Sequence, residues 1–200
     1  MIHPLRCRCG TLKGNVSHPE KVSRGVCYCR DCQAFAHFLG KPDDVLDEMG
    51  GTDVVATLPK YVSFTHGLEQ LACMSLTDKG MYRWYARCCN TAIGNTARDI
   101  KLCHVGLIHT CLEDGRRSLD EPFGPVRLRV NTKHAKGKPK AMPVSTAKAV
   151  LRFMKLLLGA RLDGSYKTNP FFKPGGEGPI VPPTVLARGE REQLMKTVSS

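Results

Sequence analysis

Apolar residues in the first 126 positions occur in short runs that are separated by turn-forming residues, a pattern typical of β-strands. Strands are predicted at residues 11–16, 25–29, 61–65, 71–76, 82–86 and 102–109. Gly80 tolerates the positive φ of a tight turn, so we expect the strands on either side of residues 78–80 to form a hairpin. A helix is predicted at 31–39 and a helical turn at 43–49.

The pattern changes in the last third of the chain. Residues 131–143 are rich in Lys, Gly and Pro and lack an apolar period, which predicts a linker or mobile loop. Residues 145–160 have a helical period, and Ser145 or Thr146 is placed to cap the helix. We expect one face of this helix to dock against its own domain, through Val150, Phe153, Met154, Leu157 and Leu158.

From residue 163 onward Gly and Pro dominate, which predicts extended chain held by Phe171 and Phe172. The whole pattern predicts a mainly β protein with a C-terminal helix and an extended tail. Its expected parts are a cysteine-rich domain over 1–126 and a C-terminal appendage over 127–200, with one amphipathic helix at about 145–160.

Composition is that of an ordinary globular protein, because 42% of the 200 residues are hydrophobic and 24% are charged. No stretch approaches the roughly 20 apolar residues that a membrane span needs. The first residues also lack the apolar segment of a signal peptide. We therefore expect no membrane contact and a cytoplasmic location.

The net charge of +12 is unevenly distributed. Residues 1–126 hold 15 Lys/Arg and 14 Asp/Glu, whereas residues 127–200 hold 15 Lys/Arg and 4 Asp/Glu. A basic segment of this kind can bind nucleic acid or an acidic partner, or it can be a solvated surface. The chain shows no nucleic-acid-binding signature, which favours the solvated surface.

Ten cysteines in a cytoplasmic chain indicate metal binding or catalysis rather than disulfides. Cys27, Cys29 and Cys32 can direct three sulfurs at one metal ion, with the fourth position open or filled from elsewhere. Two alternatives are a closed structural site and a redox pair of thiols. The candidate fourth ligands of a closed site are Cys73, Cys103, His37 and His104, although free cysteines such as Cys73, Cys103 and Cys111 are more often buried core residues.

Cys7 and Cys9 form a second block, and Gly10 lets the chain bend tightly beside them. A one-residue gap on a curved backbone lets both sulfurs face the same ion. Cys88 and Cys89 can complete that site if the backbone turns there, and Asn90 tolerates the left-handed conformation that such a turn needs.

The order of these blocks resembles the glutathione-dependent formaldehyde-activating enzyme family, which also includes centromere protein V. The resemblance covers roughly residues 5–110 and is carried by Cys-x-Cys-Gly, Cys-x-Cys-x-x-Cys and a cysteine pair after a hairpin. It implies an Mss4-like zinc-binding β fold with a structural zinc on Cys7, Cys9 and the Cys88/Cys89 region. It further implies a second zinc on Cys27, Cys29 and Cys32, close to where glutathione would bind.

The third block departs from that family, because Ala86 and Asn90 stand where the family has a cysteine and a glycine. The chain therefore resembles a divergent branch. Arg30 and Arg87 lie beside presumed ligands, where they can pair with a glutathione carboxylate or offset thiolate charge. Asp31 can act as a general base or cap the following helix, and capping is favoured.

These observations predict a zinc-dependent carbon–sulfur lyase-type enzyme that acts on a thiol adduct such as a glutathione conjugate. Two zinc ions are expected, one structural and one catalytic, the latter on Cys27, Cys29 and Cys32. One alternative is a non-catalytic, zinc-stabilised binding module whose basic C-terminal region contacts an acidic partner or nucleic acid. Another is a thiol-redox protein that forms a reversible disulfide within the central block.

Overall fold

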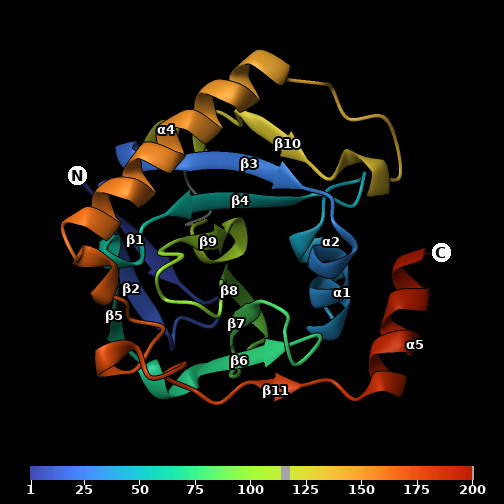
Figure 1. Cartoon of the computed structure of the whole chain (residues 1–200). Helices are drawn as coiled ribbons and strands as arrows, with labels where there is room; N and C mark the ends of the chain where they lie inside the picture. Colours follow the sequence, from blue (N-terminus) through green and yellow to red (C-terminus); the bar gives the residue numbers. More distant parts are fainter. Residues whose placement is uncertain (114–117, 200) are drawn as a thin grey trace.

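The computed structural model describes residues 1–113 and 118–199, without the side chains of residues 143, 144 and 199. In these residues eleven strands form two sheets, so the predicted mainly β fold is confirmed (Figure 1). The smaller sheet is antiparallel and has the order β1-β2-β5, with β1 at Ile2–Arg6, β2 at Lys13–Ser17 and β5 at Val62–His66.

The larger sheet has the order β10-β3-β4-β9-β8-β7-β6-β11. Its inner strands pair antiparallel, whereas β10 joins β3 and β11 joins β6 in parallel at the two edges. The strand bounds are β3 Ser23–Cys27, β4 Thr52–Thr57, β6 Leu71–Ser75, β7 Tyr82–Ala86, β8 Thr91–Thr96, β9 Val105–Ile108, β10 Leu128–Val130 and β11 Thr184–Val185.

The helices lie around the rim of the larger sheet. Figure 1 shows α4 crossing beside β10 and β3, while α1 and α5 lie side by side at the opposite end. The α-helices are α1 Arg30–Phe38, α2 Pro42–Val45, α3 Asp120–Phe123, α4 Pro143–Leu162 and α5 Arg188–Ser199. Short 3-10 helices occur at Pro19–Lys21, Pro59–Tyr61, Leu68–Gln70, His109–Cys111, Thr132–His134, Ser165–Lys167 and Pro174–Gly176. None of the helices in the described ranges is both long and apolar enough to cross a membrane.

The six predicted strands all occur, with β7 at the predicted residues and the 102–109 strand shortened to β9. The sequence pattern missed β1, β4, β8, β10 and β11. Strand β8 has only two adjacent apolar residues, Ala92 and Ile93, followed by Gly94 and Asn95, so its composition does not stand out although it is buried throughout. The two short edge strands depend on partners far along the chain, and local pattern does not reveal such pairing.

The C-terminal third differs from its prediction at three points. Helix α4 begins at Pro143 rather than at a capping residue, because Ser145 donates instead to the Arg127 carbonyl at 2.6 Å. The segment 131–143 is anchored rather than free, since the Lys136 amide donates to the Met49 carbonyl at 2.9 Å. The tail ends in α5 instead of extended chain.

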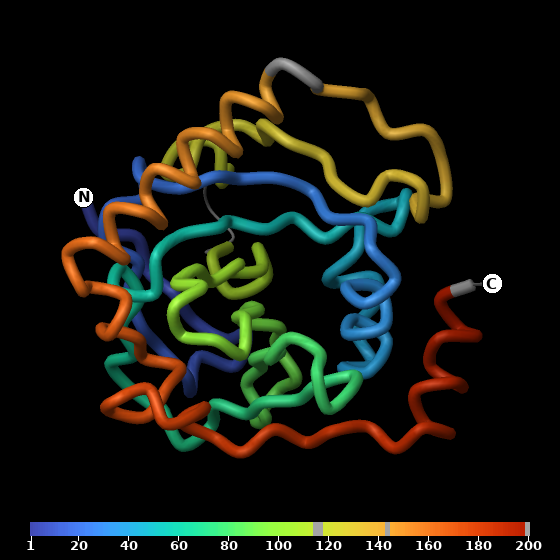
Figure 2. Tube along the Cα trace, viewed as in Figure 1, coloured from blue at the N-terminus to red at the C-terminus, as the bar shows by residue number. Residues whose placement is uncertain are grey.

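The tail after α4 runs back along the larger sheet beside β6 before it reaches α1 (Figure 2). Phe171 and Phe172 hold it, as predicted, because both are buried. Phe171 packs against Trp84 with ring centroids 5.2 Å apart, and Trp84 donates its indole N–H to Thr96 at 3.0 Å. The last third thus contributes side chains to the core and strands to the sheet, while the division at residue 126 stays a prediction.

Helix α4 is covered only in part. Leu157 packs against a small buried cluster of Leu58, Cys103 and Ala160, and the ring of Phe153 faces His104. Val150, Met154 and Leu158 are about half exposed, at 48%, 56% and 58%. The apolar face predicted to dock therefore leaves a row of apolar side chains at the surface.

Candidate metal centres and the central cavity

The first cysteine group brings together Cys7, Cys9, Cys88 and Cys89, whose sulfurs all lie within 4.8 Å of one another. The Cys7–Cys9 and Cys9–Cys88 sulfur distances are 3.4 and 3.3 Å, and the Cys7–Cys88 distance is 3.8 Å. Four thiolates at about 2.3 Å from a tetrahedral zinc ion would be about 3.8 Å apart. The predicted set of four therefore has the geometry of a four-cysteine metal centre.

Two left-handed turns place these sulfurs. Gly10 has φ +76° and donates its amide to the Cys7 carbonyl at 2.9 Å, and Asn90 has φ +53°, as predicted. The first turn joins β1 to β2 in the smaller sheet, and the second joins β7 to β8 in the larger one. A metal ion held here would link the two sheets.

Hydrogen bonds around the first group favour a mixture of thiol and thiolate before metal binds. A hydrogen bond from the Thr11 hydroxyl lowers the pKa of Cys9 to about 6. Burial raises the pKa of Cys7, which is fully buried and accepts the Leu12 amide at 3.3 Å. A divalent ion would hold all four as thiolates, because a coordinating thiol is deprotonated.

The second group contains Cys27, Cys29 and Cys32, again with all sulfurs within 4.8 Å. Cys27 ends β3, and Cys29 is the N-cap of α1, where its sulfur accepts the Cys32 amide at 3.4 Å. The favoured prediction that Asp31 caps this helix is therefore wrong. Within the described part of the chain, none of the four candidate fourth ligands (His37, Cys73, Cys103 and His104) joins this group.

Donors around the central sulfurs stabilise negative charge. Asn131 directs its side-chain amide to Cys27 at 3.5 Å, and Arg83 directs its guanidinium to Cys32 at 3.9 Å. Hydrogen bonds from the Cys29 and Cys32 thiols lower the pKa of Cys27 to about 2, while the shared protons raise the pKa values of Cys29 and Cys32. The group therefore carries thiolate character without a metal.

Arg83 is the residue that sequence analysis missed. It lies in β7 and is only 3% exposed, and it contacts Asn95 at 3.1 Å, Asp31 at 3.6 Å and the Phe35 ring at 5.6 Å. Its position between two aromatic residues of a predicted strand could have identified it from the sequence. A charged residue in a buried strand is costly unless it is paired or has a functional role.

The two arginines proposed from sequence lie elsewhere. Arg30 and Arg87 are both exposed, and Arg87 donates to the Leu71 carbonyl at 3.4 Å beside the first cysteine group. Among the described residues, neither belongs to the lining of the cavity at the central cysteines. Their predicted contact with a glutathione carboxylate stays a prediction.

The central cysteines lie in the wall of a cavity of about 380 Å³. Strands β3, β4, β7, β8, β9 and β10, or residues beside them, form its walls together with α4. Burial lowers the pKa of His104, which also lines the cavity, so its imidazole is neutral near pH 7. Three thiols, one buried cation and two proton-accepting side chains, Asp31 and His104, thus share one space.

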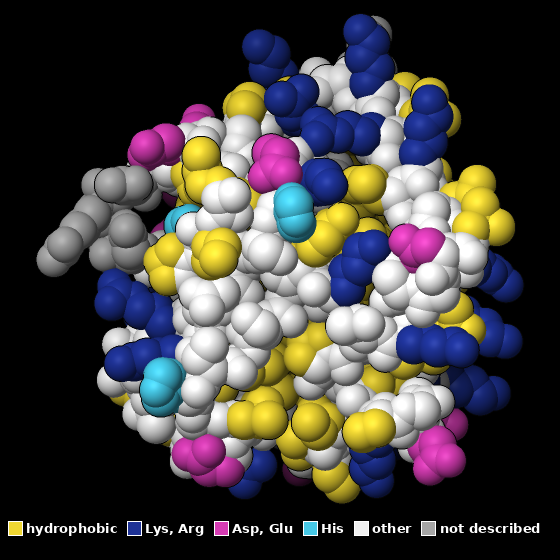
Figure 3. Space-filling view, turned by 90° about the vertical axis from the view of Figure 1, so that its left-hand side faces the viewer, with side chains coloured by type: hydrophobic (Ala, Val, Ile, Leu, Met, Phe, Trp, Pro, Cys, Tyr) yellow, Lys and Arg dark blue, Asp and Glu magenta, His cyan; other side chains and the backbone are white. Residues whose placement is uncertain are grey.

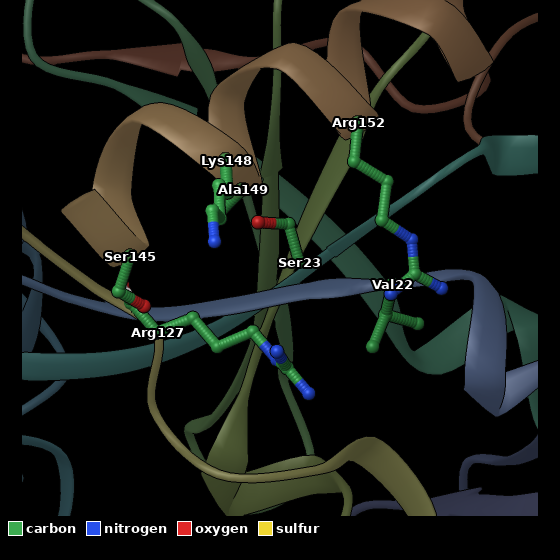
Figure 4. Close-up of a pocket in the computed structure, with 7 residues that line it drawn as sticks. All are labelled: Val22, Ser23, Arg127, Ser145, Lys148, Ala149 and Arg152. Atoms are coloured by element: carbon green, nitrogen blue, oxygen red, sulfur yellow. Dashed lines mark hydrogen bonds between the residues drawn. The ribbon is translucent and has the colours of Figure 1, made fainter.

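A second cavity, of about 410 Å³, lies against the first half of α4. Figure 4 shows Arg127, Lys148 and Arg152 extending into it beside Ser23. Val22, Ser145 and Ala149 complete its described lining, in which all the charged side chains are positive. In the view of Figure 3, Lys and Arg side chains gather toward the top, where α4 begins. Part of the excess charge of residues 127–200 is therefore concentrated in one place.

Comparisons with known proteins place the chain in a family but supply no activity. A crystal structure of a Rhodobacter sphaeroides protein shares 17% identity over 62% of this chain and 96% of that one, with a TM-score of 0.39. No curated protein matches the chain. None of these findings shows membership of the glutathione-dependent formaldehyde-activating enzyme family. The model of DUF6151, described as a family of unknown function, matches residues 1–181, and the chain belongs to that family.

Proposed function

We propose that this protein is a zinc-dependent enzyme of carbon–sulfur bond chemistry, with a structural zinc on Cys7, Cys9, Cys88 and Cys89 and a catalytic zinc on Cys27, Cys29 and Cys32. The difference between the two cysteine groups carries the proposal. The first offers four sulfurs, whereas the second offers three and lies in a cavity wall. Structural zinc sites are closed by four protein ligands, and catalytic sites keep a position for water or substrate.

The donor set fits zinc, because thiolate ligands in tetrahedral sites are typical of zinc centres. Zinc bound at the central group would hold the sulfur of a thiol substrate as a thiolate near neutral pH. Side chains of the protein would supply the other interactions with the substrate. Arg83 and Asn131 offset the negative charge on sulfur.

The reaction that fits these groups is cleavage or formation of a hydroxyalkyl thiol adduct. In the cleavage direction the carbon–sulfur bond breaks, its electron pair stays on sulfur, and the adduct hydroxyl loses its proton as a carbonyl compound departs. Asp31 and the neutral imidazole of His104 are the side chains of the cavity that can accept that proton. A cytoplasmic location, where thiols stay reduced, is part of the same proposal.

Replacing Cys29 with serine tests this function. We expect wild-type protein, purified without chelator, to contain two zinc ions per chain by mass spectrometry and the variant to contain one. Turnover of a hydroxymethyl thiol adduct should fall at least about a hundredfold, because removing a residue of a catalytic unit removes most of its effect. Cys103→Ser is the matched control, since Cys103 is a buried cysteine outside both groups.

Two zinc ions and unchanged turnover in the Cys29→Ser protein would contradict the proposal. A variant that lost both zinc ions and its secondary structure would lose activity through unfolding. Circular dichroism should therefore accompany the metal analysis. Cys27→Ser then provides an independent replacement in the same group, at the end of β3 rather than at the N-cap of α1.

The basic cavity supports a second candidate function, a non-catalytic binding module for a polyanion such as nucleic acid. Arg127, Lys148 and Arg152 supply three positive charges with no acidic residue in the described lining. Removing residues 127–200 would not test this cleanly, because these residues supply β10, β11 and the buried Phe171. Point substitutions are the sharper experiment.

We expect a double Lys148→Glu and Arg152→Glu variant to weaken any binding to a short DNA duplex by about tenfold or more, and to reduce its dependence on salt. Each phosphate contact contributes about 0.9 to the slope of log K against log salt concentration. Fluorescence anisotropy between 50 and 200 mM salt measures both. Lys173→Glu, an exposed change outside the cavity, is the control, and equal weakening by this control would contradict a specific role for the cavity.

A further inference from the structure

The wall of the central cavity combines a polar cluster with a larger set of apolar side chains. Around the cysteines, Asp31, Arg83, Asn95 and Asn131 form a connected polar cluster through the contacts described above. The lining side chains of β4, β10 and α4 are mainly apolar, chiefly Val54, Leu128, Val130, Val150, Phe153 and Met154, with His104 facing the ring of Phe153. A ligand whose sulfur meets the cysteines would therefore place its remaining atoms against apolar side chains.

The charges of the cavity do not match a peptide thiol. Glutathione carries two carboxylates and one ammonium group at neutral pH. Arg83 is the only Lys or Arg in the described lining, and Asn95 and Asp31 already contact it. At least one carboxylate would then find no free cation in the described lining, which makes its burial there unfavourable.

The side chains at the rim of the cavity favour an apolar ligand. Met81 and Val150 are 39% and 48% exposed, and Met154 beside them is more exposed still, yet all three line the cavity. Apolar surface exposed at a concave site is typical of ligand-binding grooves. Each methylene that a ligand buries there should strengthen binding about fourfold.

We propose that the central cavity selects thiols and thiol adducts that carry an apolar substituent of the aryl or branched-alkyl class, in preference to glutathione. This inference rests on the proposed function, since it takes the substrate sulfur to bind beside Cys27, Cys29 and Cys32. The substituent lies between the sheet and α4, against Phe153 and Met154. A volume of about 380 Å³ is within the range of small-molecule sites.

Binding to the cobalt-loaded full chain tests this without relying on turnover. Co²⁺ replaces zinc, and its absorption changes when a thiolate enters the coordination shell. The probes are benzyl mercaptan, glutathione and 2-mercaptoethanol, the last as a small thiol with little apolar surface. We expect benzyl mercaptan to bind at least about tenfold more tightly than either of the others. The part of the cobalt absorption that is present in wild-type protein and absent from Cys29→Ser protein is assigned to the central site.

Substitutions on α4 locate the selectivity. Phe153→Ala and Met154→Ala should each weaken benzyl mercaptan binding severalfold, with 2-mercaptoethanol unchanged, because only the larger ligand reaches these side chains. Met154 is more than half exposed, so its replacement leaves the core intact. Leu151→Ala is the matched control, since Leu151 is 61% exposed on the same helix and lies outside the cavity lining.

The possible failures are distinct. Glutathione binding as tightly as benzyl mercaptan, or equal effects of Leu151→Ala and Met154→Ala, would overturn the selectivity and leave the proposed function standing. Cobalt spectra that are identical in wild-type and Cys29→Ser protein, or that respond to no thiol, would overturn the proposed function and the inference together.

Discussion

Replacing Cys88 with serine is expected to remove one zinc ion and lower the melting temperature by roughly 10 °C. Cys88 and Cys9 are 79 residues apart in sequence, and their turns belong to different sheets. A metal clamp across them closes a long loop, and covalent closure of such a loop contributes about 4 kcal/mol. For a chain of this size each kcal/mol corresponds to about 2–4 °C.

Cys88 is exposed, so its replacement leaves no core cavity and the effect can be assigned to the metal. Differential scanning calorimetry with metal analysis measures both quantities, and chelation of the wild-type protein should reproduce the loss. Cys73→Ala, in the buried strand β6, is the control that keeps two zinc ions. An unchanged melting temperature in one-zinc Cys88→Ser protein would show that the first group is not a structural clamp.

Replacing Arg83 with methionine is expected to weaken thiolate binding at the central site by roughly ten- to a hundredfold. Three thiolates on a divalent ion leave one excess negative charge, and a bound substrate thiolate adds another. Arg83 is the buried cation that faces this charge, 3.9 Å from Cys32. Hydrogen bonds to charged groups contribute about 1.5–3 kcal/mol, which corresponds to that range of affinity.

Methionine fills part of the volume of arginine without its charge, and removal of one partner of a buried ion pair lowers stability. The cobalt spectrum measures thiolate affinity, and the melting temperature measures folding separately. Arg83→Lys should recover part of the affinity because the charge returns without the planar guanidinium. Arg87→Met is the matched control, since Arg87 is exposed beside the other cysteine group. Thiol affinity unchanged in Arg83→Met protein would contradict the role given to Arg83.

The central cysteine group was predictable because its three members are close together in the sequence. Cys27, Cys29 and Cys32 converge through one strand end and the first turn of one helix. The bend at Asn90 was visible as well, because few residues other than glycine adopt a positive φ. The prediction that the Cys7 and Cys88 blocks share one site rested on the family resemblance and on chemistry. Two cysteines one residue apart cannot by themselves complete a site with four ligands.

The edge strand β10 shows what the pattern could not reveal. It has three residues, and it forms because β3 offers a free edge and Gly25 allows a close approach. A Cβ atom at Gly25 would lie 2.8 Å from the Leu128 carbonyl oxygen. The glycine was visible in the sequence, but its partner 103 positions later in chain order was not.

Sequence by itself determined the mainly β class, the two cysteine groups, the single long helix and the concentration of positive charge after residue 126. Tertiary structure alone decided that the central three sulfurs lie in a cavity, that Arg83 rather than Arg30 or Arg87 lines it, and that α4 forms part of its wall. The physical reason is the distance along the chain over which each effect acts. Thiol spacing and helical periodicity act over a few residues, whereas the cavity is assembled from side chains between Ser23 and Met154 that meet only when the sheet is complete.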